Sequence, residues 1–155
     1  MNDTPTIAAA RRFLSLILEG APPADEVLAR ALDELALAYH DTPDGEPHQN
    51  ESEPPKTDYE GARSRLSERF PHYGHYPVAW PLSNLDEKPV LGDAIDDLAD
   101  ICGDLQKAIW RFEVLGPDDA HWHFKLQYQI HWGRHLRQVA YYLYEIIGHE
   151  KSERW

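Results

Sequence analysis

Two histidines stand four residues apart in the segment HWHFKLQYQIHWGRHL, residues 121–136. On a helix, His131 and His135 would lie on the same side, because residues i and i+4 are neighbours there. Neutral imidazole is a common ligand for zinc, iron and nickel, but two histidines fill only half of a tetrahedral zinc shell. Trp132 stands where the zinc-protease motif HExxH requires its general-base glutamate. Protease chemistry by that motif is therefore excluded.

A stripe of aspartates is the second feature with chemical potential. It lies in DAIDDLADICGDL, residues 93–105, with spacing i, i+4, i+7 and i+11 along one flank of a helix: Asp93, Asp97, Asp100 and Asp104. Like charges at i,i+4 repel each other by a few tenths of a kcal/mol, which a cation would relieve. Three interpretations remain open: a solvated flank, ion pairs or caps to other helices, and a cation site.

These two features can be combined into one metal site. If their helices are antiparallel neighbours joined by the short turn at 116–119, the acidic flank could face the two histidines. Asp97, Asp100 or Asp104 would then complete the ligand set of a divalent metal in a helical bundle. The alternative is structural, with each histidine bonded to a carboxylate or carbonyl and filling space. A divalent metal is the one cofactor that the pattern suggests.

Aromatic residues offer a different kind of site. The helix after residue 119 has a broad aromatic face, and the segment before residue 93 is also aromatic. Candidate residues for binding an organic ligand come from both: Trp80, Trp122, Tyr128 and Trp132. The one cysteine, Cys102, falls on the apolar face of its helix, which favours an inert buried thiol over a nucleophile.

Apolar periodicity predicts the elements that hold these groups. Five helices are expected, over about residues 6–19, 23–40, 57–70, 93–115 and 119–148. Asp93 is a good N-cap for the fourth helix, Gly116-Pro117 a standard stop, and Asp118 or Asp119 a cap for the fifth. No alternating strand pattern of useful length occurs. The chain is therefore expected to be a single all-α domain, a bundle spanning residues 1–155.

Two long loops interrupt this pattern. Residues 41–56 contain four prolines and no large apolar residue, which predicts a flexible acidic loop. Residues 71–92 are aromatic and rich in proline, which forbids a long helix there. The aromatic residues of this second loop lead us to expect that it packs over the bundle.

The net charge of −12 narrows the choice of partners. It comes from residues 41–60 and 86–104, each with seven acidic residues and one lysine. Basic residues are scattered, so direct nucleic-acid binding is not expected, whereas a basic protein partner would be attracted. No apolar run approaches the ~20 residues that a membrane helix needs. With one cysteine and no signal sequence, a cytoplasmic protein is expected.

Three hypotheses on function follow from these observations. The first is a non-enzymatic acidic module that binds a protein or a ligand, since no complete catalytic set is visible. The alternative is a bundle that binds a divalent metal through the aspartates and histidines named above, with hydrolysis as one such activity. The third, suggested by acidity alone, is an immunity-type or nucleic-acid-mimic inhibitor of a basic nuclease.

The segments DDLADICGDL, residues 96–105, and HWHFKLQYQIHWGRHL, residues 121–136, resemble a bacterial family called domain of unknown function 5063. That family pairs an acidic helix with an aromatic helix, and DDLADI, IHWG and HL match its pattern over a resemblance that covers residues 57–140. Cys102 departs from the aromatic residue usual at its position. The resemblance implies a small all-helical cytoplasmic protein and supplies no mechanism.

Overall fold

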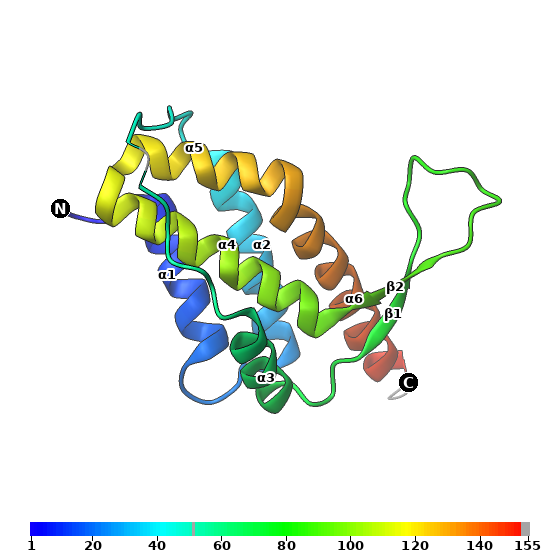
Figure 1. Cartoon of the computed structure of the whole chain (residues 1–155). Helices are drawn as coiled ribbons and strands as arrows, with labels where there is room; N and C mark the ends of the chain where they lie inside the picture. Colours follow the sequence, from blue (N-terminus) through cyan, green and yellow to red (C-terminus); the bar gives the residue numbers. More distant parts are fainter. Residues whose placement is uncertain (51, 153–155) are drawn as a thin grey trace.

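The computed structural model describes residues 1–50 and 52–152, and these form five helical rods with one small β-hairpin (Figure 1). The first four rods are α1 (Pro5–Leu18), α2 (Asp25–Asp41), α3 (Tyr59–Arg69) and α4 (Ala94–Leu115). The fifth consists of α5 (Pro117–Gln127), a π-helical turn η1 (Tyr128–Trp132) and α6 (Gly133–Ser152). The predicted all-α class and the five helices are confirmed. None of the described helices has the length and apolar character needed to cross a membrane.

The core lies between α1, α2, α4 and α6. The spacing of α4 predicts one apolar face, and all of it except the partly buried Ile109 is buried: Ala94, Leu98, Ile101, Leu105, Ala108 and Phe112. From the fifth rod, Trp132 and Leu136 enter the same core, in which Trp132 is the largest fully buried side chain. Helix α4 therefore packs against most of the other rods, which fixes the direction of its acidic flank.

Helix α3 is tied to the end of α1 by Arg65 and, through more bonds, by Arg69. Gly20, with φ of +66°, follows the last turn of α1, which has no basic residue of its own. Arg69 donates to the carbonyl oxygens of Ile17 at 2.6 Å, Gly20 at 2.7 Å and Glu19 at 3.0 Å. A guanidinium at the negative end of a helix satisfies carbonyls that lack partners within the helix.

Both ends of α4 form where the sequence predicts them. The Asp93 carboxylate accepts from the backbone N–H of Ile95 at 3.0 Å and of Asp96 at 3.3 Å. Gly116, with φ of +100°, ends the helix.

The predicted cap of the next helix was wrong. Pro117 is the first residue of α5, so this helix begins two residues before the expected start at residue 119. Asp119 instead lies buried inside the first turn, where it accepts from Arg111 at 2.9 Å. This short turn brings the fifth rod back along α4.

The aromatic loop contains a hairpin that the sequence did not predict. Strands β1 (His75–Val78) and β2 (Val90–Asp93) pair antiparallel, with Tyr76 opposite Gly92. Four-residue strands are too short to show an alternating pattern. The expectation that the whole loop packs over the bundle was also wrong. Figure 1 shows the tip of the loop between β1 and β2 projecting away from the helices, and Leu82 and Leu85 are fully exposed.

The acidic segment between α2 and α3 has no helix or strand among its described residues, as expected of a loop. It follows α5 and α4 closely (Figure 1). The backbone N–H of His48 donates to Asp119 at 2.9 Å, and Lys125 pairs with Asp44 at 2.5 Å. Its first part is thus attached to the fifth rod.

The π-helical turn explains the mid-helix glycine. A π turn inserts one extra residue into a helix and is common at functional sites. A Cβ on Gly133 would clash with the carbonyl oxygen of Tyr128 and lie 2.9 Å from its ring. The close approach that Gly133 allows is therefore made by the preceding turn of its own helix.

We expect Gly133→Ala to lower the free energy of unfolding by about 1–3 kcal/mol, because the added methyl group overpacks the turn. Gly103→Ala is the matched control, since a Cβ there meets only Thr57 at 3.9 Å in the middle of α4. It should raise stability by up to about 1 kcal/mol, the usual gain of alanine over glycine in a helix. Urea unfolding measures both, and equal effects would contradict the role of the turn.

Candidate metal centre

The fifth rod places both histidines of the sequence motif against the acidic flank of α4, as the metal hypothesis requires. Nδ1 of His131 lies 2.5 Å from a carboxylate oxygen of Asp104. Nδ1 of His135 lies 2.7 Å from a carboxylate oxygen of Asp97. Because a carboxylate accepts hydrogen bonds, each of these bonds puts a proton on Nδ1 and fixes the plane of the ring.

The other nitrogen of each ring lies near one shared carboxylate. Nε2 of His135 lies 3.2 Å from Oδ2 of Asp100, and Nε2 of His131 lies 3.8 Å from its Oδ1. Three such ligand atoms all lie within 4.8 Å of one another. Ligands 2.0–2.1 Å from one tetrahedral zinc ion stand about 3.3 Å apart. The two distances from the histidine nitrogens to the Asp100 carboxylate are therefore close to those of a common ligand shell.

The aspartates that bond Nδ1 of the histidines are more deeply buried than Asp100, which lies near both Nε2 atoms. The side chains of Asp97 and Asp104 are only 3% and 7% exposed. The side chain of Asp100 is 23% exposed, and those of His135 and His131 are 20% and 41% exposed. The solvated-flank interpretation is thus wrong for Asp97 and Asp104. The three groups that could hold an ion reach solvent, and the two that orient them do not.

Tyr76 completes the support of Asp97 from the hairpin. Its hydroxyl donates to the second carboxylate oxygen of Asp97, so both oxygens of that aspartate are engaged. The ring lies against Gly92, where a Cβ would be 2.7 Å away, and stacks on Tyr142 with centroids 5.0 Å apart. The sequence gives no signal for this residue, because Tyr76 acts through a hairpin that the sequence does not indicate.

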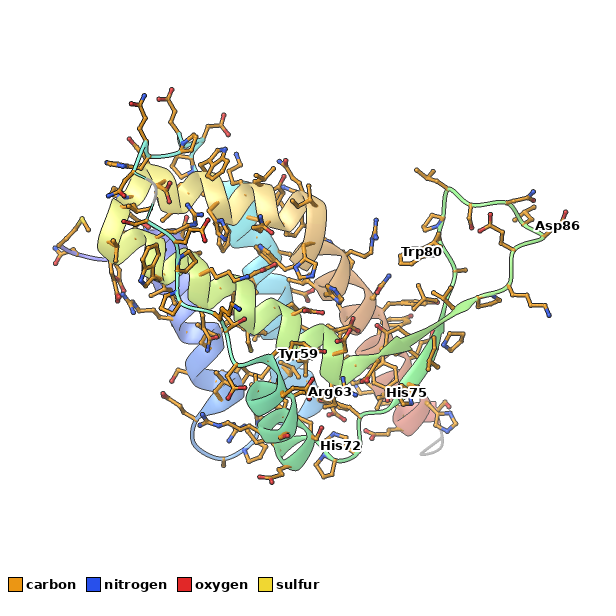
Figure 2. The ribbon with its side chains drawn as sticks, viewed as in Figure 1. Tyr59, Arg63, His72, His75, Trp80 and Asp86 are labelled. Atoms are coloured by element: carbon orange, nitrogen blue, oxygen red, sulfur yellow. The ribbon has the colours of Figure 1, made fainter. Side chains whose placement is uncertain are left out.

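Helix α3 covers the first turn of α4. Figure 2 shows Tyr59 and Arg63 of α3 beside the start of α4. The Tyr59 hydroxyl donates to Asp96, and Arg63 pairs with Asp93 at 2.6 Å. Asp93 is thereby used as a cap and an ion pair and is unavailable to an ion. The stripe thus divides into one structural aspartate and three that face the histidines.

The cluster has an excess of negative charge, which a bound cation or a proton would offset. Burial raises the pKa of Asp97 and Asp104, although their histidine partners partly oppose this. Burial also raises the pKa of Asp100. For His135, burial alone would lower the pKa, but the bond to Asp97 and the charge of Asp100 outweigh it and raise the pKa. With both rings neutral, three carboxylates would face each other at low dielectric. A proton on His135 or a metal ion relieves this excess charge.

A second group of possible ligands, formed by Asp96, Asp97 and His135, overlaps the first. It is the weaker candidate, since both oxygens of Asp97 and Nδ1 of His135 already form hydrogen bonds within the protein. Asp96 likewise accepts from Tyr59. Among the described residues, the set of Asp100, His131 and His135 is therefore better suited to hold an ion.

The four aromatic candidates do not form one pocket. Trp132 is fully buried and donates to the carbonyl oxygen of Phe124, so it has no surface to offer a ligand. Tyr128 stacks on Tyr39 with centroids 3.7 Å apart. Trp122 on α5 lies by Arg111, whereas Trp80 contacts Arg134 from the hairpin.

Cys102 lies where the sequence predicts. Its side chain is buried, and burial raises the pKa of the thiol to about 12. It has no reactive thiolate at neutral pH.

The chain matches one known protein family. The family model described as Domain of unknown function (DUF5063) matches residues 6–149. The chain belongs to this family. No curated protein matches it significantly. A solved structure of the same fold is protein BF1032 from Bacteroides fragilis, with 19% sequence identity and a TM-score of 0.71. The match covers 91% of this chain and 89% of that one, so the fold extends over nearly the whole length of both.

Asp97→Asn should lower the pKa of His135 in metal-free protein. Asparagine can still accept the Nδ1–H bond through its carbonyl oxygen, but it lacks the negative charge that stabilises the imidazolium. NMR titration of the ring nitrogens measures the shift. Asp118→Asn, which removes an exposed carboxylate at the start of α5, should leave the titration unchanged. An unaltered His135 titration in Asp97→Asn would contradict this electrostatic coupling.

Proposed function

We propose that this protein binds a divalent transition-metal ion through Nε2 of His131, Nε2 of His135 and the carboxylate of Asp100. One observation carries the proposal: both histidines use Nδ1 on a buried aspartate while their Nε2 atoms converge on one carboxylate. A histidine that fills space needs one hydrogen-bond partner. Here each ring has a partner on one side and a second, shared carboxylate on the other.

The buried aspartates match the usual surroundings of metal-bound histidine. Such a ring generally donates its other N–H to a carboxylate or carbonyl, which fixes the ring and raises the basicity of the ligating nitrogen. Asp104 and Asp97 occupy this position for His131 and His135. Holding two buried carboxylates for this purpose is costly, since each must be taken out of water.

The ligand types favour zinc or iron over magnesium or calcium. Imidazole nitrogen suits Zn²⁺, Fe²⁺ and Ni²⁺, whereas Mg²⁺ and Ca²⁺ prefer oxygen. Three protein ligands leave at least one coordination position open, which is the pattern of catalytic and not of structural zinc sites. Zinc in such a site brings the pKa of a bound water near 7, which supports hydrolysis as the reaction class.

We expect the untagged protein to bind one Zn²⁺ per chain in isothermal titration calorimetry. His135→Gln and Asp100→Asn each remove a ligand and should abolish tight binding. Asp97→Asn leaves the ligands in place and should weaken affinity by about 10–100-fold, as expected for an orienting group.

His72→Gln is the matched control. His72 also pairs with an aspartate, Asp25, at 3.0 Å, but it lies at the lower end of α3 in Figure 2, outside the centre. Its loss should leave Zn²⁺ affinity unchanged. Stoichiometry well below one in wild type, or an equal loss of affinity in His72→Gln, would count decisively against the proposal.

Metal affinity should fall as the pH is lowered. The ion binds only the deprotonated ring, and the pKa of His135 is raised, so protons compete with the metal at higher pH than for an ordinary histidine. Below that pKa, affinity should drop by about tenfold per pH unit for each displaced proton. Calorimetry in buffers of different ionisation enthalpy counts the protons released. Affinity independent of pH between 5 and 8 would oppose this assignment.

A protein-interaction role is the second candidate, and one observation favours it. The projecting loop exposes Leu82 and Leu85 completely, and Leu91 on β2 is largely exposed. Several large apolar residues left exposed on one projecting segment favour an interaction surface. The acidic flank is less suited to a partner than its composition suggests, because Asp97 and Asp104 are buried inside the domain. The two roles use different surfaces and are compatible.

A further inference from the structure

A pocket of about 610 Å³ lies between α6 and the hairpin. This volume is in the range of sites for small organic molecules. Figure 2 shows Trp80 on the limb of the projecting loop nearer the helices, with Asp86 at the outer tip. The residues that define the pocket come from both sides: Val78, Trp80 and Leu82 from the hairpin and its loop, and Arg134, Arg137 and Tyr141 from α6.

The charge of this pocket is opposite to that of the chain. The protein has a net charge of −12, yet the lining includes two arginines and no acidic residue. Within residues 1–50 and 52–152, neither arginine forms an ion pair, whereas Arg63 and Arg111 each pair with an aspartate. Two unpaired guanidinium groups on one wall attract anions.

The two arginines are held in place without losing their capacity to bind an anion. The guanidinium of Arg134 lies 4.6 Å from the centre of the Trp80 ring. Nε of Arg137 donates to the hydroxyl of Tyr128 at 3.1 Å, which leaves its terminal nitrogens free of that bond. Arg134 and Arg137 are three residues apart on a helix and thus neighbours on its surface. Both can therefore reach the same anionic group.

Apart from Gln138, the rest of the lining consists of apolar and aromatic residues, several of which are exposed to solvent. Trp80 is 38% exposed and Tyr141 is 66% exposed. Exposed aromatic rings beside a concave surface are typical of ligand sites, because a bound ring recovers the apolar contact that water does not provide. The pocket thus combines an anion-binding wall with an apolar floor.

We propose that this pocket binds a small organic anion with an aromatic or apolar body. The carboxylate, sulfonate or phosphate group lies between the guanidinium groups of Arg134 and Arg137, which suit the planar and bidentate recognition of such oxygens. The apolar body lies against Trp80 and Val78. None of the proposed metal ligands lines the pocket, so this site stands independently of the metal centre.

Two probes that differ in charge test the proposal. The first is 8-anilino-1-naphthalenesulfonate, an aromatic anion. The second is N-phenyl-1-naphthylamine, which has the same rings without the sulfonate. Both become fluorescent in apolar surroundings. We expect the folded, metal-free protein to bind one sulfonate probe per chain, at least tenfold more tightly than the uncharged probe.

Variants separate the two parts of the pocket. The double substitution Arg134→Gln/Arg137→Gln should lower the affinity for the sulfonate probe at least tenfold and leave the affinity for the uncharged probe unchanged. Trp80→Ala should lower the affinity for both probes. Arg30→Gln, an exposed arginine on α2, is the control and should affect neither. Added salt should weaken only the sulfonate probe in wild type, a readout that does not depend on any variant folding.

Three results would overturn the proposal. The first is equal affinity of the wild type for the two probes. The second is retention of sulfonate binding in the double arginine variant. The third is a dimer in sedimentation that covers this face with a second copy of the chain. Because every titration is made with a metal chelator present, failure here and failure of zinc binding are distinguishable.

Discussion

The pairing of two buried aspartates with two histidines is the constraint on which the rest of this structure depends. Removing Asp97 and Asp104 from water is costly, and the loss is offset only while each keeps its imidazole partner. The bonds join α4 to the fifth rod at two levels, so the two helices cannot slide past each other without exposing an unpaired carboxylate. Helix register, ring orientation and the convergence of both Nε2 atoms on Asp100 follow from this one requirement.

Local irregularities serve the same arrangement. The π-helical turn at Tyr128–Trp132 ends at Gly133, immediately between the two histidines, and sets their relative direction. The hairpin brings Tyr76 over Gly92 and onto Asp97. Each feature departs from ideal geometry within a few residues of the cluster, where a regular helix or a plain loop would not place the same atoms.

Much of this could be predicted from the sequence, and the limits are physical. Apolar spacing was sufficient for five helices. The short turn at Gly116 made an antiparallel pairing of His131 and His135 with the acidic stripe one hypothesis, which the structure bears out. Spacing alone places Asp97 on one flank of its helix. The burial of Asp97 could not be predicted, because it depends on which other elements pack against that flank. The π turn has no distinct sequence period. Trp132, a candidate for ligand binding, is a core residue because the rod turns that ring inward. Trp80 was a candidate because it is aromatic. Its contact with Arg134 could not be predicted, because it depends on the position of the hairpin.

The ligand cluster is also local along the chain. Asp104 and His131 are 27 residues apart, and Asp97 and His135 are 38 apart. Closing loops of this length loses less chain entropy than joining residues across the whole domain, and contacts between near residues form early in folding. The centre can therefore assemble in the helical hairpin of α4 and the fifth rod before α1 and α2 dock. If the proposed centre binds metal, the ion would stabilise this helical hairpin as well as the finished protein.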